Sequence, residues 1–440
     1  MLQRRWKEGR HATSAVRVHS HNVECIELVD GSPAGPLMLT ASWDGSLCVV
    51  RRSDWRVLLH AAGHSGWVTC MAVQLGGGGG AGLTVVTGGT DGQLLVWDLG
   101  SASWREPPRR LPHEAAAVTC TAFAGGLRPR DRHRQGIVVS GADDCLARVW
   151  DTASGTCLAA LAGHSAVVWG LCALGGPRMR VATSSRDGTA RLWDLAGSDG
   201  RTWRPRDGQP LRGIAAAEVC RKHSAAVLSM DATVVAAEDP RFFATGGADG
   251  LCALWDSATG ECRTTFTGHS HGVHCVKLAS FRNLLPEEER YAAGDPSMPP
   301  AHLASGSQDC TVRIWCTRSG QCLAELRDHQ NPVVAISCCG SVIVSLAPGD
   351  GALAYYCEGS QAQGRTSSSG GRPMARTRAA RLRQQVTEAR AATESGFRNI
   401  VSLMEGAALS FQAAVRMNST CLVLGSRTGD VLVLDYGASL

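Results

Sequence analysis

GGTDGQLLVWD, from Gly88 to Asp98, is the stretch that decides the fold, because the chain repeats it. In each repeat a Trp follows a turn Asp by six positions, and the related stretches are SGADDCLARVWD (Ser140–Asp151), SSRDGTARLWD (Ser184–Asp194), GGADGLCALWD (Gly246–Asp256) and SGSQDCTVRIWC (Ser305–Cys316). Alternating residues before the Trp are typical of a β-strand, and Asp-Gly or Asp-Cys predicts a tight turn in front of it. The chain is therefore built from a recurring turn-and-strand unit.

These repeats resemble the WD repeat, the four-stranded blade of a β-propeller. The resemblance implies an all-β WD40 β-propeller built from four-stranded antiparallel sheets. Stacked blades form one closed body, so the 440 residues need not divide into two or three domains. We expect eight blades, with seven blades plus an irregular C-terminal segment as the alternative.

The expected boundaries follow from where the repeats weaken. Residues 1–14 are expected to be a flexible N-terminus, residues 15–357 a closing strand and blades 1–7, residues 358–398 an Arg-rich insert, and residues 399–440 the outer strand of blade 7 and blade 8. Blade 1 has Val50 where the Trp would stand, and blade 7 has Tyr356 six positions after Asp350.

The last repeat has no outer strand of its own. Its strands are predicted at Ala408–Val415, Cys421–Gly425 and Val431–Leu434, after an outer strand of blade 7 at Asn399–Met404. Propellers of this family often close with an N-terminal segment in the final blade, and Ala15–His19 fits that role. Closure removes two exposed sheet edges.

The net charge of +5 lies in the insert. Between Glu358 and Arg398 there are eight arginines and three glutamates, a net of +5, so the rest of the chain is balanced. A neutral propeller body argues against a broad nucleic-acid surface. Within the insert, Gly359–Gly371 is of low complexity and predicts disorder, and Pro373–Ser395 predicts a short basic helix.

Composition argues for a soluble intracellular protein. The sequence contains no run of 18 or more apolar residues, so we expect no membrane span. The basic N-terminus lacks the apolar core of a secretory signal, although an organellar transit peptide is an alternative. The 18 cysteines are scattered, with no Cys-x-x-Cys pair and no zinc spacing, which favours small buried hydrophobes in a reducing compartment. We expect a cytoplasmic protein, with the nucleus as the alternative location, without metal or cofactor.

In WD repeats a His, a Ser or Thr, the turn Asp and the Trp form a hydrogen-bonded tetrad. The resemblance implies five such sets: His64, Thr87, Asp91 and Trp97; His113, Ser140, Asp144 and Trp150; His164, Thr183, Asp187 and Trp193; His223, Thr245, Asp249 and Trp255; and His269, Ser305, Asp309 and Trp315. A His, a hydroxyl and an Asp also suggest a nucleophile triad. Because the constellation occurs five times, we expect a structural role, no catalytic residue and no enzyme.

Binding is expected on the propeller face near its axis. The residues before each turn Asp are Trp43, Thr90, Asp143, Arg186, Ala248 and Gln308, and those just inside each innermost strand are Glu24, Thr69, Thr119, Trp169, Leu228, His274 and Val334. Trp43, Trp169, Arg186 and His274 are the candidate anchors, because Trp and Arg dominate interface hot spots. Each could equally be a packing residue.

Three functions compete. The first is a scaffold, a monomer within a larger complex, that docks a protein or peptide on this face. The second is the substrate receptor of a ubiquitin ligase, since the repeats resemble F-box WD propellers. Against it, only Arg186 matches their phosphopeptide-binding arginines, and Trp315-Cys316-Thr317-Arg318 lacks the Asp of the cullin-4 adaptor motif. The third is binding of the insert to an acidic surface of RNA, lipid or microtubules.

Overall fold

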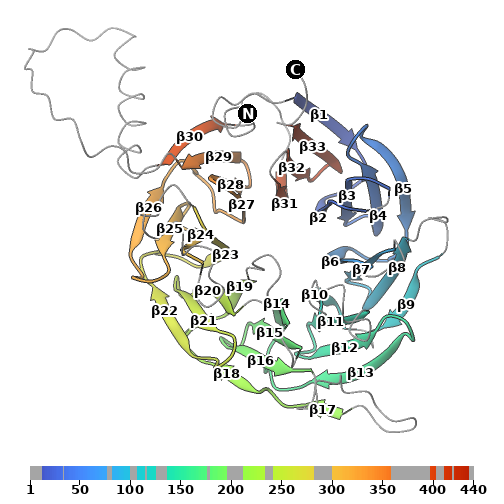
Figure 1. The fold of residues 1–440 in the computed structure, drawn as a ribbon, viewed down its shortest axis with the longest axis horizontal. Helices are drawn as coiled ribbons and strands as arrows, with labels where there is room; N and C mark the ends of the chain where they lie inside the picture. The colour runs from blue at the N-terminus through green and yellow to red at the C-terminus, as the bar shows by residue number, and fades with distance from the viewer. Residues whose placement is uncertain are drawn as a thin grey trace, which may run out of the picture.

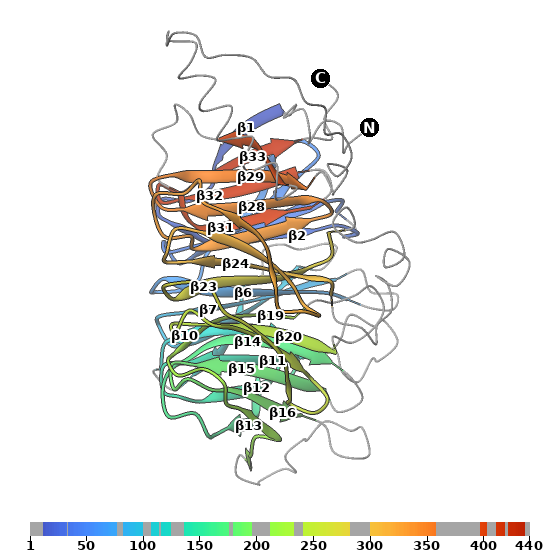
Figure 2. The same ribbon diagram turned by 90° about the vertical axis from the view of Figure 1, so that its left-hand side faces the viewer.

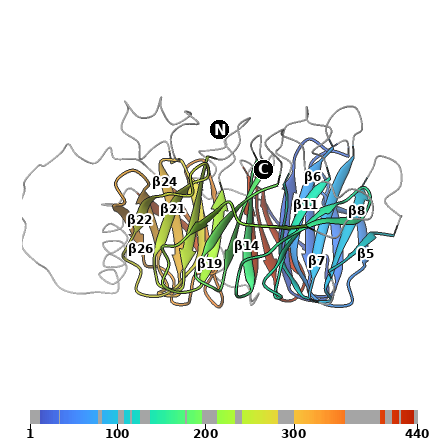
Figure 3. The ribbon, with the colours of Figure 1, turned by 90° about the horizontal axis from the view of Figure 1, so that it is seen from below.

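The computed structural model describes residues 12–32, 34–76, 82–99, 107–113, 116–124, 136–175, 179–195, 212–232, 241–281, 300–357, 397–402, 411–418 and 421–435. In these residues the chain is all-β and forms an eight-bladed propeller. Figure 1 looks down the ring, with the innermost strand of each blade around the centre. Figures 2 and 3 show the ring edge-on, with the strands crossing from one face to the other.

Within a blade, consecutive strands pair antiparallel from the centre outward. Blades 1 to 4 consist of β2 (Val23–Val29), β3 (Leu37–Ser42), β4 (Ser46–Arg51) and β5 (Arg56–Ala62); β6 (Val68–Leu75), β7 (Leu83–Gly89), β8 (Gln93–Leu99) and β9 (Arg109–Pro112); β10 (Val118–Phe123), β11 (Ile137–Ala142), β12 (Ala147–Asp151) and β13 (Thr156–Leu161); β14 (Val168–Gly175), β15 (Arg180–Ser185), β16 (Ala190–Asp194) and β18 (Glu218–Cys220).

The second half of the ring repeats this order until its last blade. Blades 5 to 8 consist of β19 (Val227–Ala232), β20 (Phe242–Gly247), β21 (Cys252–Asp256) and β22 (Cys262–Phe266); β23 (Val273–Ala279), β24 (His302–Ser307), β25 (Val312–Cys316) and β26 (Cys322–Leu326); β27 (Ala335–Cys339), β28 (Val342–Ala347), β29 (Gly351–Cys357) and β30 (Phe397–Ser402); β31 (Phe411–Met417), β32 (Cys421–Ser426), β33 (Asp430–Asp435) and β1 (Ala12–Arg17).

The N-terminal strand closes the ring. β1 pairs antiparallel with β33, from Ala12 opposite Asp435 to Arg17 opposite Asp430. The two strands lie side by side at the seam in Figure 1. The eight-blade prediction is therefore confirmed, and blade 8 contains strands from both ends of the described chain.

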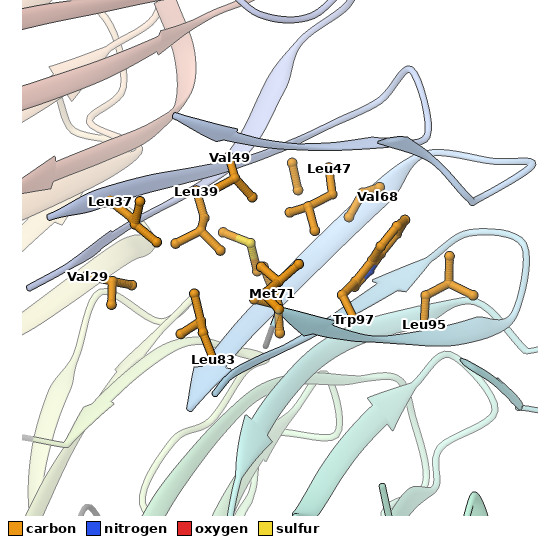
Figure 4. Packing of buried hydrophobic residues seen from close by; sticks show 13 residues of the cluster. Val29, Leu37, Leu39, Leu47, Val49, Val68, Met71, Leu83, Leu95 and Trp97 are labelled. Atoms are coloured by element: carbon orange, nitrogen blue, oxygen red, sulfur yellow. The ribbon is translucent and has the colours of Figure 1, made fainter. Parts of the chain in front are cut away.

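The core lies between neighbouring blades. In Figure 4, Leu37, Leu39 and Val49 of blade 1 face Met71 and Leu83 of blade 2. At Gly88 on β7 an added Cβ would come within 2.6 Å of Val118 Cγ1 on the next blade and 2.7 Å of Cys70 Sγ. The blades thus contact each other so closely that glycine is needed at this point.

Several predicted element boundaries were wrong. The closing strand is Ala12–Arg17, three residues earlier at its start than predicted, so residues 12–14 belong to the propeller and not to a flexible N-terminus. Likewise β30 begins at Phe397, inside the predicted insert, and β31 begins at Phe411, three residues after its predicted start. The weak turn signals around the last repeat do not fix strand ends.

Two elements, β9 and β17, have no counterpart among the predicted strands. β17 (Arg212–Ile214) adds to the outer edge of blade 3 by pairing parallel with β13, which makes that sheet five-stranded. The remainder of the predicted insert, including the helix at Pro373–Ser395, lies outside the described residues. No helix in the described ranges is long and apolar enough to cross a membrane.

Candidate interaction face

Four of the five predicted tetrads have the full chain of contacts. In blade 2, His64 Nδ1 lies 3.0 Å from Asp91 Oδ1, and His64 Nε2 lies 2.9 Å from Thr87 Oγ1. The Trp97 indole N–H donates to the same hydroxyl oxygen over 3.0 Å. The same contacts occur in blades 4, 5 and 6, within the sets His164, Thr183, Asp187 and Trp193; His223, Thr245, Asp249 and Trp255; and His269, Ser305, Asp309 and Trp315.

The tetrads were predicted as structural sets, and their Ser, Thr and Trp side chains are buried in the core, where a partner cannot reach them. In blade 4, Trp193 is fully buried, and its indole N–H donates to Thr183 Oγ1 over 2.9 Å. In blade 5, Thr245 is fully buried and Trp255 is 2% exposed, and the Trp255 indole N–H donates to Thr245 Oγ1 over 2.9 Å. Trp193, Thr245 and Trp255 therefore belong to the packing inside and between blades, and they are no part of an interaction face.

Burial and hydrogen bonding set the charges of these groups. Burial lowers the pKa of His164 and of His269, so both imidazoles favour the neutral form. Burial alone would raise the pKa of Asp187, but the hydrogen bonds from Thr189 and His164 outweigh it and lower this pKa to about 2. The Thr183 hydroxyl at the centre of this set is fully buried and already has two partners. Such a hydroxyl serves packing and has no access to a substrate.

Blade 3 departs from the expected contact between His113 and Asp144. Arg148 lies between them: its guanidinium donates to Asp144 Oδ2 over 2.6 Å and to His113 Nδ1 over 3.1 Å. The links from His113 and Trp150 to Ser140 remain, at 2.8 and 2.9 Å. Burial, followed by the charge of Arg148, lowers the pKa of His113 to about 4, so its ring is a neutral acceptor.

Blades 1 and 7 hold incomplete sets that the repeat pattern did not single out. In blade 7, His329 Nε2 lies 2.7 Å from Ser345 Oγ, while His329 Nδ1 is 3.5 Å from Asp350. Tyr355, opposite Ile343, has the register that Trp97 has opposite Val85. The predicted alignment of Tyr356 with the Trp position was therefore wrong, because the turn before Asp350 is one residue longer than in the other blades.

In blade 1, His19 follows the closing strand and takes the place of the tetrad histidine. Its Nε2 lies 2.8 Å from Thr40 Oγ1, and its Nδ1 lies 2.7 Å from Ser46 Oγ and 3.4 Å from Asp44 Oδ1. Val50 stands in the Trp position, as the sequence indicated.

Repeated backbone hydrogen bonds place the predicted ring of turn residues beside the starts of the innermost strands. Each residue before a turn Asp donates its N–H to a carbonyl at the start of its blade, and the pairs are Trp43–Asn22, Thr90–Trp67, Asp143–Ala117, Arg186–Val167, Ala248–Ala226 and Gln308–Gly272, at 2.8–3.1 Å. The two predicted rings of residues therefore lie on one face of the propeller, around its axis.

An aromatic pair spans blades 1 and 2 on this face. The rings of Trp43 and Trp67 are stacked, with centroids 4.4 Å apart and planes inclined by 9°. Trp67 is 53% exposed, the largest fraction among the large hydrophobic residues that are exposed in the described part of the chain. The Trp43 indole N–H donates to Glu24 Oε2 over 2.9 Å, and Asn22 donates to the same oxygen. Burial raises the pKa of Glu24 despite these two donors.

Sequence reasoning missed Trp67. The residue directly precedes the buried Val68 at the start of β6, two positions before Thr69, the ring residue that was considered in this blade. A Trp next to the start of an innermost strand, in the loop that faces the neighbouring turn, is the signal that could have identified it.

The other predicted anchors lie on blades 4 and 6. Trp169 is 38% exposed and Arg186 is exposed, and the two belong to the same blade. His274 on β23 is exposed as well, and desolvation lowers its pKa. Aromatic and cationic groups are thus available on blades 1, 2, 4 and 6.

Two positions of the inner ring are occupied by contacts between blades. Thr69 Oγ1 donates to Gly88 O over 3.1 Å and to Val118 O of the next blade over 2.5 Å. Thr119 repeats this with Gly141 O and Val168 O. Leu228 and Val334 are half-buried. These four residues pack the ring and offer little to a partner.

The comparisons with known proteins agree with this geometry. The model of the WD domain, G-beta repeat, matches residues 13–50, 55–98, 155–194, 217–256 and 260–316. The computationally designed Ika8 protein has a similar fold, with a TM-score of 0.63 and 20% identity over 96% of this chain and 98% of that chain.

Curated relatives match part of their length. Nuclear distribution protein PAC1 of Arthroderma otae is 27% identical over 46% of this chain and 51% of its own length. Mitochondrial division protein 1 of Aspergillus clavatus is 31% identical over 46% of this chain and 33% of its own. WD repeat-containing protein pop1 of Schizosaccharomyces pombe is 29% identical over 26% of this chain and 18% of its own. The matches thus span about half or less of these proteins. With its repeats and its propeller, this chain belongs to the WD40-repeat family, whose fold is a general scaffold for protein interactions.

Proposed function

We propose that this protein is a non-enzymatic scaffold that docks a peptide or protein segment on the face that carries Trp43 and Trp67. The observation that supports this most directly is the exposed ring of Trp67, stacked on the half-buried Trp43 beside the Glu24 carboxylate. Trp67 and Trp169 leave apolar surface open to water at the starts of β6 and β14. Burying such rings against a partner is favourable, and Trp and Arg are the residues that most often dominate binding energy.

The polar groups on the face favour one orientation of a bound segment. Glu24 has the donors Trp43 and Asn22, both uncharged, so a cationic group of a partner near the Trp pair would be favourable. Arg186 on blade 4 suits an acidic or carbonyl group. A segment that crosses the axis from blade 1 to blade 4 would thus meet opposite preferences at its two ends.

The cellular setting is part of the proposal. All 18 cysteines are free thiols, which fits a reducing compartment. Two relatives are, by name, proteins of nuclear distribution and of mitochondrial division. We therefore place the protein in the cytoplasm, as a subunit of a larger complex. The ubiquitin-ligase receptor stays a prediction from the sequence. Binding of the insert to an acidic surface also stays a prediction, because residues 358–396 lie outside the described residues.

The test is quantitative affinity purification of partners with the intact chain. The variants are Trp67→Ala and Trp169→Ala/Arg186→Glu, and the control is Leu323→Ala, which removes a side chain as exposed as Trp169 but on the outer strand β26. We expect the two face variants to lose the same partners, with recovery of each partner reduced at least about tenfold, as for hot-spot residues. The control should recover these partners in the wild-type amount. A partner set that depends only on residues 359–395, shown by deleting them, would contradict docking on this face.

A further inference from the structure

The contact between the blade histidine and its turn Asp is longer in blade 1 than in the four complete tetrads. In the four complete tetrads the His Nδ1 and the nearest Asp oxygen are 2.7–3.1 Å apart. In blade 1 the distance from His19 Nδ1 to Asp44 Oδ1 is 3.4 Å. The blade also has no indole donor, because Val50 takes the Trp position. His19 and Asp44 therefore lack both the short contact and the indole donor of a complete tetrad.

A second histidine completes a cluster of metal-binding side chains. His19, Asp44 and His60 each offer one ligand atom, and the three atoms lie within 4.8 Å of one another. Ser46 Oγ lies among them, 2.7 Å from His19 Nδ1, 2.5 Å from Asp44 Oδ1 and 3.2 Å from His60 Nε2. A tetrahedral Zn²⁺ site with bonds of about 2.0–2.1 Å needs ligand atoms roughly 3.3 Å apart. Small side-chain shifts would bring these four atoms to that spacing.

The surroundings favour the ligand forms of His19 and Asp44. The Thr40 hydroxyl holds His19 Nε2 at 2.8 Å, and with no indole donating to it this oxygen can accept the Nε2–H. That tautomer leaves the Nδ1 lone pair facing the cluster, the arrangement in which a second-shell partner orients a metal-bound imidazole. Burial lowers the pKa of His19 to about 4, so the ring is neutral near pH 7. Burial alone would raise the pKa of Asp44, but hydrogen bonds from Ser46 and Ser20 outweigh it and lower this pKa to about 2.

Three of the other blades place a cation where blade 1 has none. Four residues after the turn Asp, blades 3, 4 and 6 carry Arg148, Arg191 and Arg313, and each of these charges lowers the pKa of the histidine in its blade. Blade 1 has the uncharged Cys48 at this position, and His60 of β5 lies opposite it. A divalent cation would thus meet repulsion in those blades and ligands in blade 1.

From this geometry we propose that His19, Asp44 and His60 bind a divalent transition-metal ion, Zn²⁺ in a reducing compartment, with the Ser46 hydroxyl as the neighbouring fourth group. The two histidines and the carboxylate come from three segments: the residues after β1, the turn before β4, and β5. His19 is also held by blade 8, because the N–H groups of Val18 and His19 bond to Gly429 O. The ion would therefore fasten the closing segment to blade 1 at the seam of the ring.

Zinc titration of the intact, chelator-treated protein tests this inference. The informative variant is His60→Ala, because His60 is exposed and its loss should leave the apo protein folded. His271→Ala, an exposed histidine of blade 6, is the matched control. By calorimetry we expect the wild type and the control to bind one more equivalent of Zn²⁺ than His60→Ala, or to bind it at least about tenfold more tightly.

Two further readouts separate this site from binding by the cysteines, which are the same in the wild type, His60→Ala and His271→Ala. The unfolding temperature should rise with Zn²⁺ in the wild type and in His271→Ala, and less in His60→Ala, although the three apo proteins unfold alike. His60→Cys should restore the effect, since a thiolate is also a zinc ligand. Identical titrations and identical temperature shifts for the wild type and His60→Ala would overturn the proposal. Neither result depends on the partner-docking face.

Discussion

At the scale of single residues, one hydroxyl connects two buried side chains in each complete tetrad. Ser305 of blade 6 is fully buried, and its Oγ lies 2.7 Å from His269 Nε2 and accepts from the Trp315 indole over 2.8 Å. In Ser305→Ala both groups lose a partner at a place that water does not reach. An unpaired buried group costs about 1–3 kcal/mol, so we expect a loss of this order in the free energy of unfolding.

The measurement is a urea unfolding curve of Ser305→Ala beside that of Ser319→Ala. Ser319 is exposed in the turn before β26, and its substitution should change the free energy of unfolding by less than about 0.5 kcal/mol. Equal urea midpoints for the two variants would mean that the shared hydroxyl contributes nothing to stability.

The resemblance to the WD repeat, applied through the common spacing, identified the residues of these sets, but it did not predict the contacts of Arg148 in blade 3. The hydroxyl four before the Asp and the Trp six after it identify the members because strand geometry is the same in each blade. Which group the Arg of the third strand contacts depends on the residue opposite it on the outer strand. In blade 6, Glu325 on β26 holds Arg313 at 2.9 Å, whereas in blade 3 Ala160 faces Arg148, which turns to Asp144 instead.

At the scale of the strands, close contact between blades depends on glycine in the second strand. Gly88 of β7 has no room for a Cβ, because Val118 of blade 3 and Cys70 of its own blade are too near. Gly88→Ala must therefore move β10 or distort the β6–β7 pair. Forcing a methyl group into a packed core costs typically about 1–3 kcal/mol, and we expect this loss in the free energy of unfolding.

Gly82→Ala is the control in the same blade, since a Cβ there would meet nothing nearer than Asp98 Oδ1 at 3.9 Å. Thermal unfolding followed by circular dichroism compares the two. Should Gly88→Ala unfold at the temperature of Gly82→Ala, the blades would have to be packed more loosely than the structure indicates.

Strands differed in how far the sequence could predict them. The inner three strands of blades 2 to 6 were recognisable because each carries either the alternation or the Asp-turn-Trp pattern. Outer strands such as β9 and β30 have neither, since they contact one neighbour and face solvent on the other side. β17 has only three residues, too few for any periodicity, and its pairing with β13 depends on a loop from the next blade.

At the scale of the whole molecule, the closure of the ring was predictable from the strands expected in the first and the last repeat. The last repeat lacked an outer strand and the N-terminus had an unassigned one, and β1 pairs with β33 accordingly. The interaction face was less predictable. Trp43, Trp169 and Arg186 could be placed on it from the repeat register, whereas the stacking of Trp67 on Trp43 arises between two blades and appears in no single repeat.

The closing strand provides the last prediction. Deleting residues 1–17 removes β1 and exposes the backbone of β33 from Asp430 to Asp435 as an unpaired edge. Unpaired edges are templates for pairing with another chain, so we expect a lower unfolding temperature and soluble oligomers or aggregates. Deleting residues 1–11 keeps β1 and is the control. Both proteins are compared by light scattering after size exclusion and by thermal unfolding. Because β1 supplies every backbone hydrogen bond on the outer side of β33, a monomeric 1–17 deletion that unfolds at the temperature of the control could not be reconciled with a ring closed by this strand.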